Sequence, residues 1–316
     1  MTERSGPAGD TTGGSVPTTP VCYRHPDRET YVRCTRCNRP ICPECMRDAS
    51  VGHQCPECVS EGRRGVRPAR TAFGGGAAGR HGYVTKVLIA LNVLMMVLSI
   101  ASDRGGDAAA GGSGFGGLMG GSTPLTDWGS VLAYATYTEG GPLHGVAAGE
   151  WYRLVTAMFL HYGVVHLLLN MWALWVLGRT LEAVLGPLRF LALYLLAGLG
   201  GNVAVYLFSA PNSTSAGAST AIFGLFAAIF VIMRRLGRDT SSIVPILVIN
   251  LIFTFTVPGI SIAGHLGGLV IGAVMALVLA YAPRMRRTVF QAAGSAIVLV
   301  ALVGLALVRT GMLTGG

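Results

Sequence analysis

From residue 84 onward the chain alternates between long apolar runs and short polar segments. A helix needs about 20 apolar residues to cross the bilayer core, and within lipid only a helix satisfies the backbone of such a segment. The pattern therefore predicts an all-α polytopic membrane protein. We interpret seven runs as membrane helices: 84–101, 154–177, 187–208, 216–233, 242–257, 260–282 and 289–308.

Two runs depart from the expected length. The run at 154–177 is longer than the bilayer requires, so we expect its first residues to belong to the preceding loop, 102–153. His144 lies in this loop and is expected to be solvated. The run at 242–257 is short, and Pro258 and Gly259 separate it from the next run.

Composition and charge agree with a membrane protein. Hydrophobic residues make up 51% of the chain and charged residues 12%, whereas a soluble globule is about a quarter charged. The net charge of +9 fits basic cytoplasmic loops better than a nucleic-acid partner. With the N-terminus inside, only Arg104, Arg153 and Arg309 of the 24 basic residues fall outside. We therefore expect a multi-pass protein of the cell membrane with a cytoplasmic N-terminus, the lipid bilayer as a partner and no bound nucleic acid.

All seven cysteines lie between Cys22 and Cys58. An odd number of closely spaced cysteines that includes CxxC pairs is more typical of metal ligands than of disulfides. The first 20 residues have no apolar core, so we expect neither a signal peptide nor a membrane anchor there. This segment is therefore expected to be cytosolic, where thiols stay reduced.

Four Cys/His pairs with two intervening residues supply eight ligands, enough for two structural, tetrahedral Zn²⁺ sites. Reduced structural cysteines or a disulfide cluster are the alternative. The order of the pairs resembles a B-box-type zinc finger, a family that often closes its second site with His, so His53 could replace Cys55. The interleaved wiring that we predict places Cys22, His25, Cys42 and Cys45 on one zinc and Cys34, Cys37, Cys55 and Cys58 on the other.

A second group of polar residues lies inside the apolar runs. Ser219 is in the fourth run and His265 in the sixth, while His161, His166 and Asn170 belong to the second. Polar groups are costly in a bilayer, so they are candidates for function. Ser219 can act as nucleophile and His265 as its general base. His166 and Asn170, four residues apart on one helix face, can bind an oxyanion together with the backbone N–H of Ser219.

No carboxylate accompanies this serine and histidine along the chain. Asp and Glu are absent from 183 to 238 and after Asp239. We therefore predict a Ser-His dyad rather than a triad.

Taken together, these residues resemble the rhomboid family of intramembrane serine proteases. The resemblance covers about 84–282 and includes the GxS motif ending at Ser219, the HxxxGxxxG motif beginning at His265 and the string His161, His166 and Asn170. Residues 150–153, Glu-Trp-Tyr-Arg, are similar to the Trp-Arg motif of the family's first outer loop. The resemblance implies a rhomboid-like six-helix core, here with one C-terminal transmembrane helix added. It also implies cleavage of transmembrane protein substrates without a catalytic cofactor, at an active site that opens to the outer face.

Three positions depart from the family pattern. Thr220 stands where many members have Gly, Phe223 stands where a Tyr often stacks on the catalytic His, and Tyr152 separates the Trp from the Arg. These differences concern local packing and the anchoring of the loop.

The predicted domain organisation has five parts. They are a disordered N-terminus (1–20), a small zinc-binding module (21–60), a basic linker (61–83), the membrane protease core (84–282) and an additional helix with a tail (283–316).

Other interpretations of these residues stay open. A lone serine usually bonds back to its own helix, glycines four apart form a packing face, and His161 could serve only to brace the fold. Accordingly, the alternatives are a catalytically inactive rhomboid-like binder of membrane clients, a membrane-anchored RING-like ligase or adaptor, and a transporter.

Overall fold

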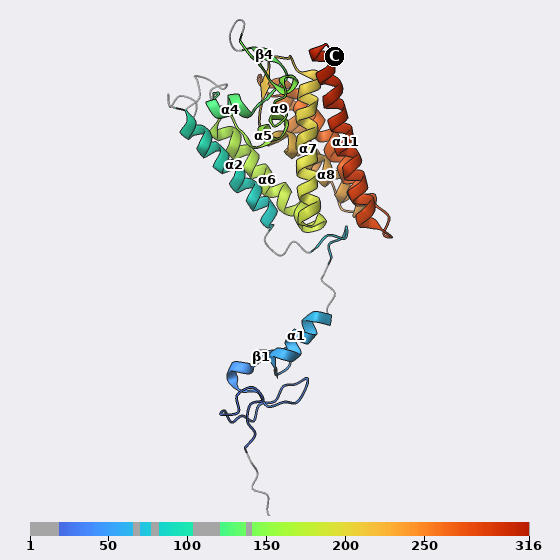
Figure 1. The fold of residues 1–316 in the computed structure, drawn as a ribbon. Coiled ribbons are helices and arrows are strands. Elements are labelled where there is room, and N and C mark those ends of the chain that lie inside the picture. The colour runs from blue at the N-terminus through green and yellow to red at the C-terminus, as the bar shows by residue number, and fades with distance from the viewer. Residues whose placement is uncertain (1–18, 66–69, 77–81, 104–120, 137–140, 316) are drawn as a thin grey trace, which may run out of the picture. The chain divides into compact units, whose positions relative to one another are not determined.

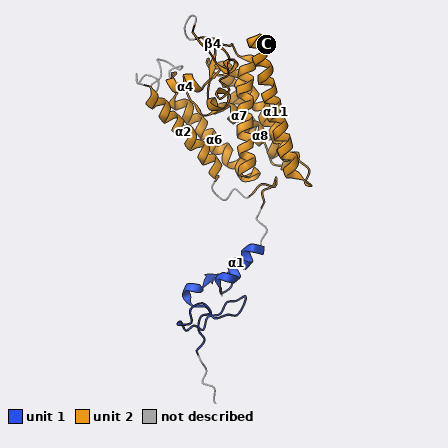
Figure 2. Cartoon of the chain, in the orientation of Figure 1, with its two compact units in different colours: residues 1–68 blue, residues 69–316 orange. Residues whose placement is uncertain are grey.

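The structure is a computed structural model that describes residues 19–65, 70–76, 82–103, 121–136 and 141–315. Most of the predicted disordered N-terminus and parts of the predicted linker and first loop lie outside these residues. The chain divides into two compact units, residues 1–68 and 69–316 (Figure 2). The finer five-part division stays a prediction.

The described part of the second unit is a bundle of apolar helices (Figure 1). Each predicted run contains one long helix, which confirms the all-α membrane class. Among the described residues, five helices are long and apolar enough to span a bilayer: α2, α6, α7, α10 and α11. The long helices are α2 (Tyr83–Ser102), α6 (Val164–Leu185), α7 (Pro187–Phe208), α8 (Ser219–Arg235), α9 (Ile243–Thr256), α10 (Ile262–Tyr281) and α11 (Arg287–Thr314).

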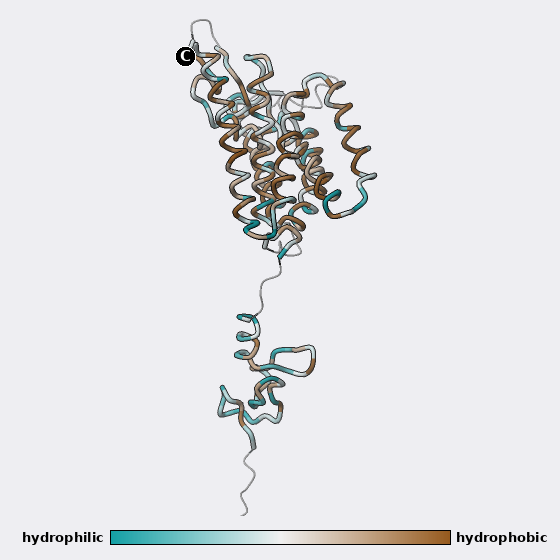
Figure 3. Tube along the Cα trace, turned by 90° about the vertical axis from the view of Figure 1, so that its right-hand side faces the viewer, coloured by the Kyte–Doolittle hydropathy of each residue, from teal (hydrophilic) through white to brown (hydrophobic). Residues whose placement is uncertain are grey.

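Hydropathy follows this division of the chain. Figure 3 shows brown, hydrophobic residues along the helices of the bundle and mostly paler or teal residues in the first unit. The start of α6 at Val164 puts the first part of the run 154–177 in the loop, as its excess length indicated.

Close packing of α8 against α10 sets the geometry of the bundle centre. A Cβ on Gly268 would lie 1.9 Å from the carbonyl oxygen of Thr220, and a Cβ on Gly272 would lie 2.2 Å from Cα of Gly224. Any side chain at these positions would push the two helices apart. Because Ser219 begins α8 and His265 lies in the first turns of α10, this contact also fixes the distance between them.

The segment between α2 and α6 is folded onto the bundle by short elements. Strand β3 (Val131–Leu132) pairs antiparallel with β6 (Thr214–Ser215), just before α8. This pairing ties the loop to the segment that leads into Ser219. The remaining elements are α4 (Pro124–Gly129), the antiparallel pair β4 (Ala135–Thr136) and β5 (Leu143–His144), η4 (Val146–Ala148), α5 (Arg153–Thr156) and η5 (Ala157–Phe159).

The start of α2 is capped by a carboxylate from another helix. Glu182, in the last turn of α6, is fully buried. Its Oε1 accepts the N–H of Val84 at 3.0 Å, and its Oε2 accepts the N–H and the hydroxyl of Thr85 at 2.9 and 2.8 Å. The first amides of a helix lack helical partners and form its positive end, so this buried carboxylate stabilises the start of α2.

The first unit has little apolar core. Its described elements are η1 (Pro43–Cys45), the antiparallel strands β1 (Arg47–Asp48) and β2 (His53–Gln54), and α1 (Pro56–Gly65). Its buried cluster consists of cysteines together with Ile41. So few apolar side chains contribute little hydrophobic stabilisation, and metal coordination would supply what is missing.

Candidate active site and metal centres

Ser219 and His265 face each other across the contact between α8 and α10. Ser219 Oγ lies 2.9 Å from His265 Nε2, although the residues are 46 positions apart in the chain. Ser219 is half-buried and His265 is 8% exposed. The hydroxyl therefore lies within proton-transfer distance of the imidazole in a largely water-excluded setting.

Gly217 brings the nucleophile next to a second histidine. Its φ of +148° is rarely adopted by residues with a side chain. A Cβ there would lie 3.0 Å from Nε2 of His166 and 3.3 Å from Ser219 Oγ. The absence of a side chain at this position therefore lets the His166 ring lie beside the serine hydroxyl.

Thr254, in α9, contacts the far side of the His265 ring. Its hydroxyl lies 2.8 Å from His265 Nδ1 and donates to the Asn250 carbonyl at 2.8 Å. A hydroxyl has one proton to donate. Because that proton goes to Asn250, the oxygen accepts Nδ1–H and leaves the Nε2 lone pair directed at Ser219.

Thr254 is not among the residues predicted from the sequence. It is the one buried residue of α9, but a threonine in an apolar helix usually bonds back to its own backbone. Only the folded structure shows the second contact.

Phe223 stacks on His265, with ring centroids 4.0 Å apart and an interplanar angle of 16°. A phenylalanine therefore keeps the stacking that the family's tyrosine provides. Thr220, the other departure within α8, is buried against α10.

The three residues of the His/Asn string, His161, His166 and Asn170, differ in their contacts. Asn170 donates one amide N–H to the His166 carbonyl at 2.8 Å. His161 lies in the loop before α6 rather than in the helix, and its ring is 5.0 Å from that of His166. Its Nε2 is 3.5 Å from the N–H of Ala218, so His161 contacts the segment that carries Ser219.

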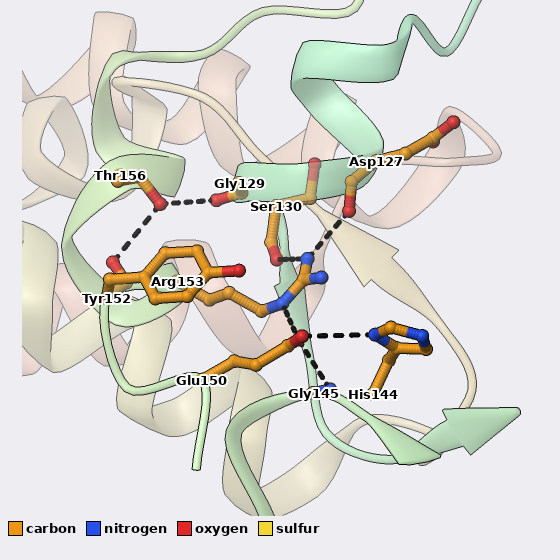
Figure 4. A network of polar contacts seen from close by, with 9 residues as sticks. All are labelled: Asp127, Gly129, Ser130, His144, Gly145, Glu150, Tyr152, Arg153 and Thr156. Carbon is orange, nitrogen blue, oxygen red and sulfur yellow. Dashed lines mark hydrogen bonds and ion pairs between the residues drawn. The ribbon is translucent and has the colours of Figure 1, made fainter. Parts of the chain in front are cut away.

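The loop before α6 is anchored by a buried arginine (Figure 4). Arg153 is 2% exposed and donates to Glu150 and to the carbonyl oxygens of Asp127 and Ser130, the latter two at 2.7 and 3.0 Å. The inserted Tyr152 does not prevent this anchoring. Its ring stacks on Trp128 with centroids 4.7 Å apart.

Glu150 connects this arginine to the β4–β5 pair. Its carboxylate lies 3.1 Å from Nδ1 of His144 and accepts the N–H of Gly145 at 2.7 Å. Burial raises the pKa of the Glu150 carboxyl, but hydrogen bonds from His144, Gly145 and Arg153 outweigh it and lower the pKa below its usual value. His144, which we expected to be solvated, keeps a 32% exposed side chain and also contacts Glu150.

In the first unit the Cys/His pairs gather into two clusters. Within each, the four ligand atoms lie within 4.8 Å of one another, close enough for one metal ion. His25 Nδ1 lies 3.3 Å from Cys42 Sγ and 3.5 Å from Cys45 Sγ. The clusters are Cys22, His25, Cys42 and Cys45, and Cys34, Cys37, Cys55 and Cys58.

His53 belongs to neither cluster. Its Nε2 is 3.7 Å from an Asp48 carboxylate oxygen, and its side chain is 41% exposed. Cys55 is fully buried and lies 3.7 Å, sulfur to sulfur, from Cys37. The geometry therefore favours Cys55 over His53 as the fourth ligand.

The thiols of the two clusters differ in pKa. Burial raises the pKa of the Cys22 thiol, but hydrogen bonds from the backbone of Arg24, Cys42 and His25 outweigh it and lower the pKa to about 6. Burial raises the pKa of Cys58, in the other cluster, to about 12. A bound Zn²⁺ would favour the thiolate form of every ligand.

Comparisons with known proteins identify the family of a large part of the second unit. A family described as "Rhomboid domain" matches residues 148–282. The chain is 42% identical over 135 residues to the rhomboid protease GluP of Bacillus subtilis (strain 168), covering 40% of this chain and 26% of the relative. It is 38% identical over 130 residues to YdcA, a rhomboid-type protein of the same organism, covering 40% of this chain and 65% of YdcA.

Plant proteins match as well, RHOMBOID-like protein 5 of Arabidopsis thaliana among them, at 33% identity over 147 residues. That match covers 44% of this chain and 47% of the relative. The chain thus spans between a quarter and two thirds of the length of these relatives. The Rhomboid-domain match does not extend to the Cys/His clusters.

Proposed function

Because the chain belongs to the rhomboid family, we propose that it is an intramembrane serine protease that hydrolyses peptide bonds in transmembrane helices of other membrane proteins. The observation that carries this proposal is the 2.9 Å distance between Ser219 Oγ and His265 Nε2. A serine becomes a useful nucleophile when a base within hydrogen-bond reach takes its proton.

In the proposed mechanism Ser219 Oγ attacks the scissile carbonyl carbon while His265 Nε2 takes the hydroxyl proton. The imidazolium then gives this proton to the leaving amine, and water hydrolyses the acyl-enzyme in a second round of the same transfers. Thr254 accepts Nδ1–H throughout, so it orients the ring and stabilises the positive charge that forms on it. No carboxylate is needed to keep His265 in the tautomer that carries its proton on Nδ1.

The negative charge on the tetrahedral intermediate requires donors beside Ser219. We assign this role to the His166 ring, to the first-turn amide of Ser219 in α8 and to the second N–H of Asn170. Helix-start amides have no helical partners and are directed at anions. The bond from Asn170 to the His166 carbonyl also fixes the turn that presents the His166 ring.

For the first unit we propose two structural Zn²⁺ ions, one in each Cys/His cluster. Three thiolates with one imidazole, and four thiolates, are both common tetrahedral zinc sets. We further propose that this unit and the basic ends of the helices are cytoplasmic, following the positive-inside rule. The site at the start of α8 then opens to the outer face, where water is available for hydrolysis.

The decisive experiment is cleavage of a generic transmembrane substrate by the purified, reconstituted chain. Ser219→Ala and His265→Ala should each abolish cleavage, and the double variant should be no worse than either single, because the two residues act as one unit. A fluorophosphonate should label the wild type but not Ser219→Ala. Ser213→Ala, at a half-buried serine shortly before α8, is the matched control and should behave as wild type.

Continued cleavage by Ser219→Ala would contradict the protease mechanism. A well-folded wild type that binds substrate but neither cleaves it nor reacts with the fluorophosphonate would instead identify an inactive binder of membrane clients.

A further inference from the structure

A group of arginines surrounds a cavity at the end of the bundle where α10 ends and α7 and α11 begin. The cavity has a volume of about 450 Å³. Arg189 lies beside the cavity, close to Arg287. A Cβ built on Gly74, which lines the cavity, would be 3.9 Å from Nη2 of Arg189 and 3.7 Å from Nη1 of Arg287. The arginines that line the cavity are Arg70, Arg284, Arg286 and Arg287.

Three of these side chains are held in place. Arg189 Nε donates to Oε1 of Gln291 at 2.7 Å, Arg287 Nη1 donates to the Ala72 carbonyl at 3.0 Å, and Arg70 Nη1 donates to the Gly74 carbonyl at 3.3 Å. These bonds leave most of the guanidinium N–H groups available, because each group has five donors.

The segment 70–76 is part of the bundle wall at this point. Phe73 is 4% exposed, and its carbonyl accepts an N–H from the buried Gln291 at 3.3 Å. The same amide nitrogen of Gln291 lies 2.7 Å from the Leu279 carbonyl in α10. The cavity is therefore built from three parts of the chain: the segment 70–76, the end of α10 and the start of α11.

The cavity carries positive charge without a counter-charge. Among the described residues, no carboxylate forms an ion pair with any of the five arginines. Glu182 bonds to the start of α2, and Asp239 bonds to Ser241. The positive-inside rule explains why arginines occur at this end of the helices. It does not require several of them to converge on one cavity, where they repel each other.

We propose that this cavity binds the phosphate group of an anionic phospholipid. Guanidinium groups match phosphate geometry with paired N–H donors, and basic pockets between transmembrane helices suit lipid head groups. Because α11 is a candidate membrane span, its first residues lie at head-group depth. No side chain caps the start of α11 at Arg286, so its first amides add to the attraction for an anion.

A bound phosphate would connect the end of α10, the start of α11 and the segment 70–76. None of the proposed catalytic groups takes part, so the proposal does not depend on protease activity.

The test uses the purified full chain in a neutral detergent. Three additions are compared: phosphatidylglycerol, phosphatidylcholine with the same acyl chains, and inorganic phosphate. Native mass spectrometry counts the bound lipid, and the unfolding temperature is measured for each addition. We expect phosphatidylglycerol to bind preferentially and to raise the unfolding temperature. Each arginine near a membrane surface contributes roughly a fivefold gain in affinity, so Arg284→Gln with Arg286→Gln should weaken this binding about 25-fold.

The matched control is Arg234→Gln with Arg238→Gln, which removes two exposed arginines at the end of α8 and should leave the lipid preference unchanged. Arg284 alone provides a second variant, because its side chain makes no hydrogen bond to the described residues, so Arg284→Gln should fold normally. Equal binding of the two lipids by wild type, or an equal loss in the control pair, would overturn the proposal. A shift produced by inorganic phosphate alone would assign the cavity to free phosphate and overturn the lipid source.

Discussion

Replacing Thr254 with valine tests how the base is held. Valine has nearly the same shape as threonine, so the packing of α9 against His265 is preserved. What is lost is the oxygen 2.8 Å from His265 Nδ1. The imidazole would then have a buried N–H without its acceptor, or would adopt the other tautomer, in which Nε2–H faces Ser219 and cannot take its proton.

The size of the effect follows from the charge that forms on the ring. An unpaired buried donor costs about 1–3 kcal/mol, and hydrogen bonds to charged groups contribute about 1.5–3 kcal/mol. The imidazolium exists only after proton transfer, so most of this loss should raise the barrier rather than weaken substrate binding. We expect kcat to fall about 5- to 150-fold for losses of this size, with KM changed little.

The assay is steady-state cleavage of a transmembrane substrate in vesicles, together with the rate of fluorophosphonate labelling. Thr254→Ser keeps the hydroxyl and should restore most of the rate. The matched control is Thr256→Val, on the exposed side of the same helix. Among the described residues, the hydroxyl that it removes bonds to the Ile252 carbonyl alone, at 2.8 Å. That variant should cleave like wild type.

A folded Thr254→Val variant with wild-type kcat would refute the tautomer argument. The same would follow if Thr254→Ser were as slow as Thr254→Val, because the hydroxyl would then not be the group that matters.

Three further predictions concern other parts of the molecule. Elemental analysis of the full chain should find two zinc ions. His53→Ala should leave that number unchanged and Cys55→Ala should lower it, so two ions in Cys55→Ala would contradict the assigned ligands. Gly268→Leu should prevent folding, since even a Cβ would lie 1.9 Å from the Thr220 carbonyl oxygen, and a wild-type unfolding temperature would disprove this packing. Because the pKa of Glu150 is lowered in the fold, its stabilisation is present above the unfolded value of about 4.3 and disappears as pH falls through the lower folded value. The unfolding temperature of Glu150→Gln should therefore lose part of this acid dependence, and identical pH profiles would argue against the ion-pair network.

The sequence was sufficient to predict the helical class, because within the bilayer a helix is the structure that satisfies the backbone hydrogen bonds of a long apolar segment. An apolar run of sufficient length predicts a helix, and the excess length of 154–177 correctly indicated a loop before Val164. The grouping of Cys/His pairs could be predicted for a similar reason, since metal coordination admits few spacings. The roles of Ser219, His265, His166 and Asn170 stay predictions.

What the sequence could not provide are contacts that ordinary residues make between different structural elements. Thr254 and Glu182 are common residue types at unremarkable positions, and their partners depend on how the helices pack. His144 shows the same limit, because only the pairing of β4 with β5 brings its ring to Glu150. Local pattern carries no information about such contacts.

The cap on α2 has a consequence for the order of folding. Synthesis produces α2 long before Glu182, which lies 97 and 98 residues beyond the amides that it accepts. Until α6 has been synthesised, the amides of Val84 and Thr85 lack this acceptor. The first turn of α2 therefore acquires its final hydrogen bonds only when α6 packs beside it, so the stability of one helix end depends on the arrival of another helix.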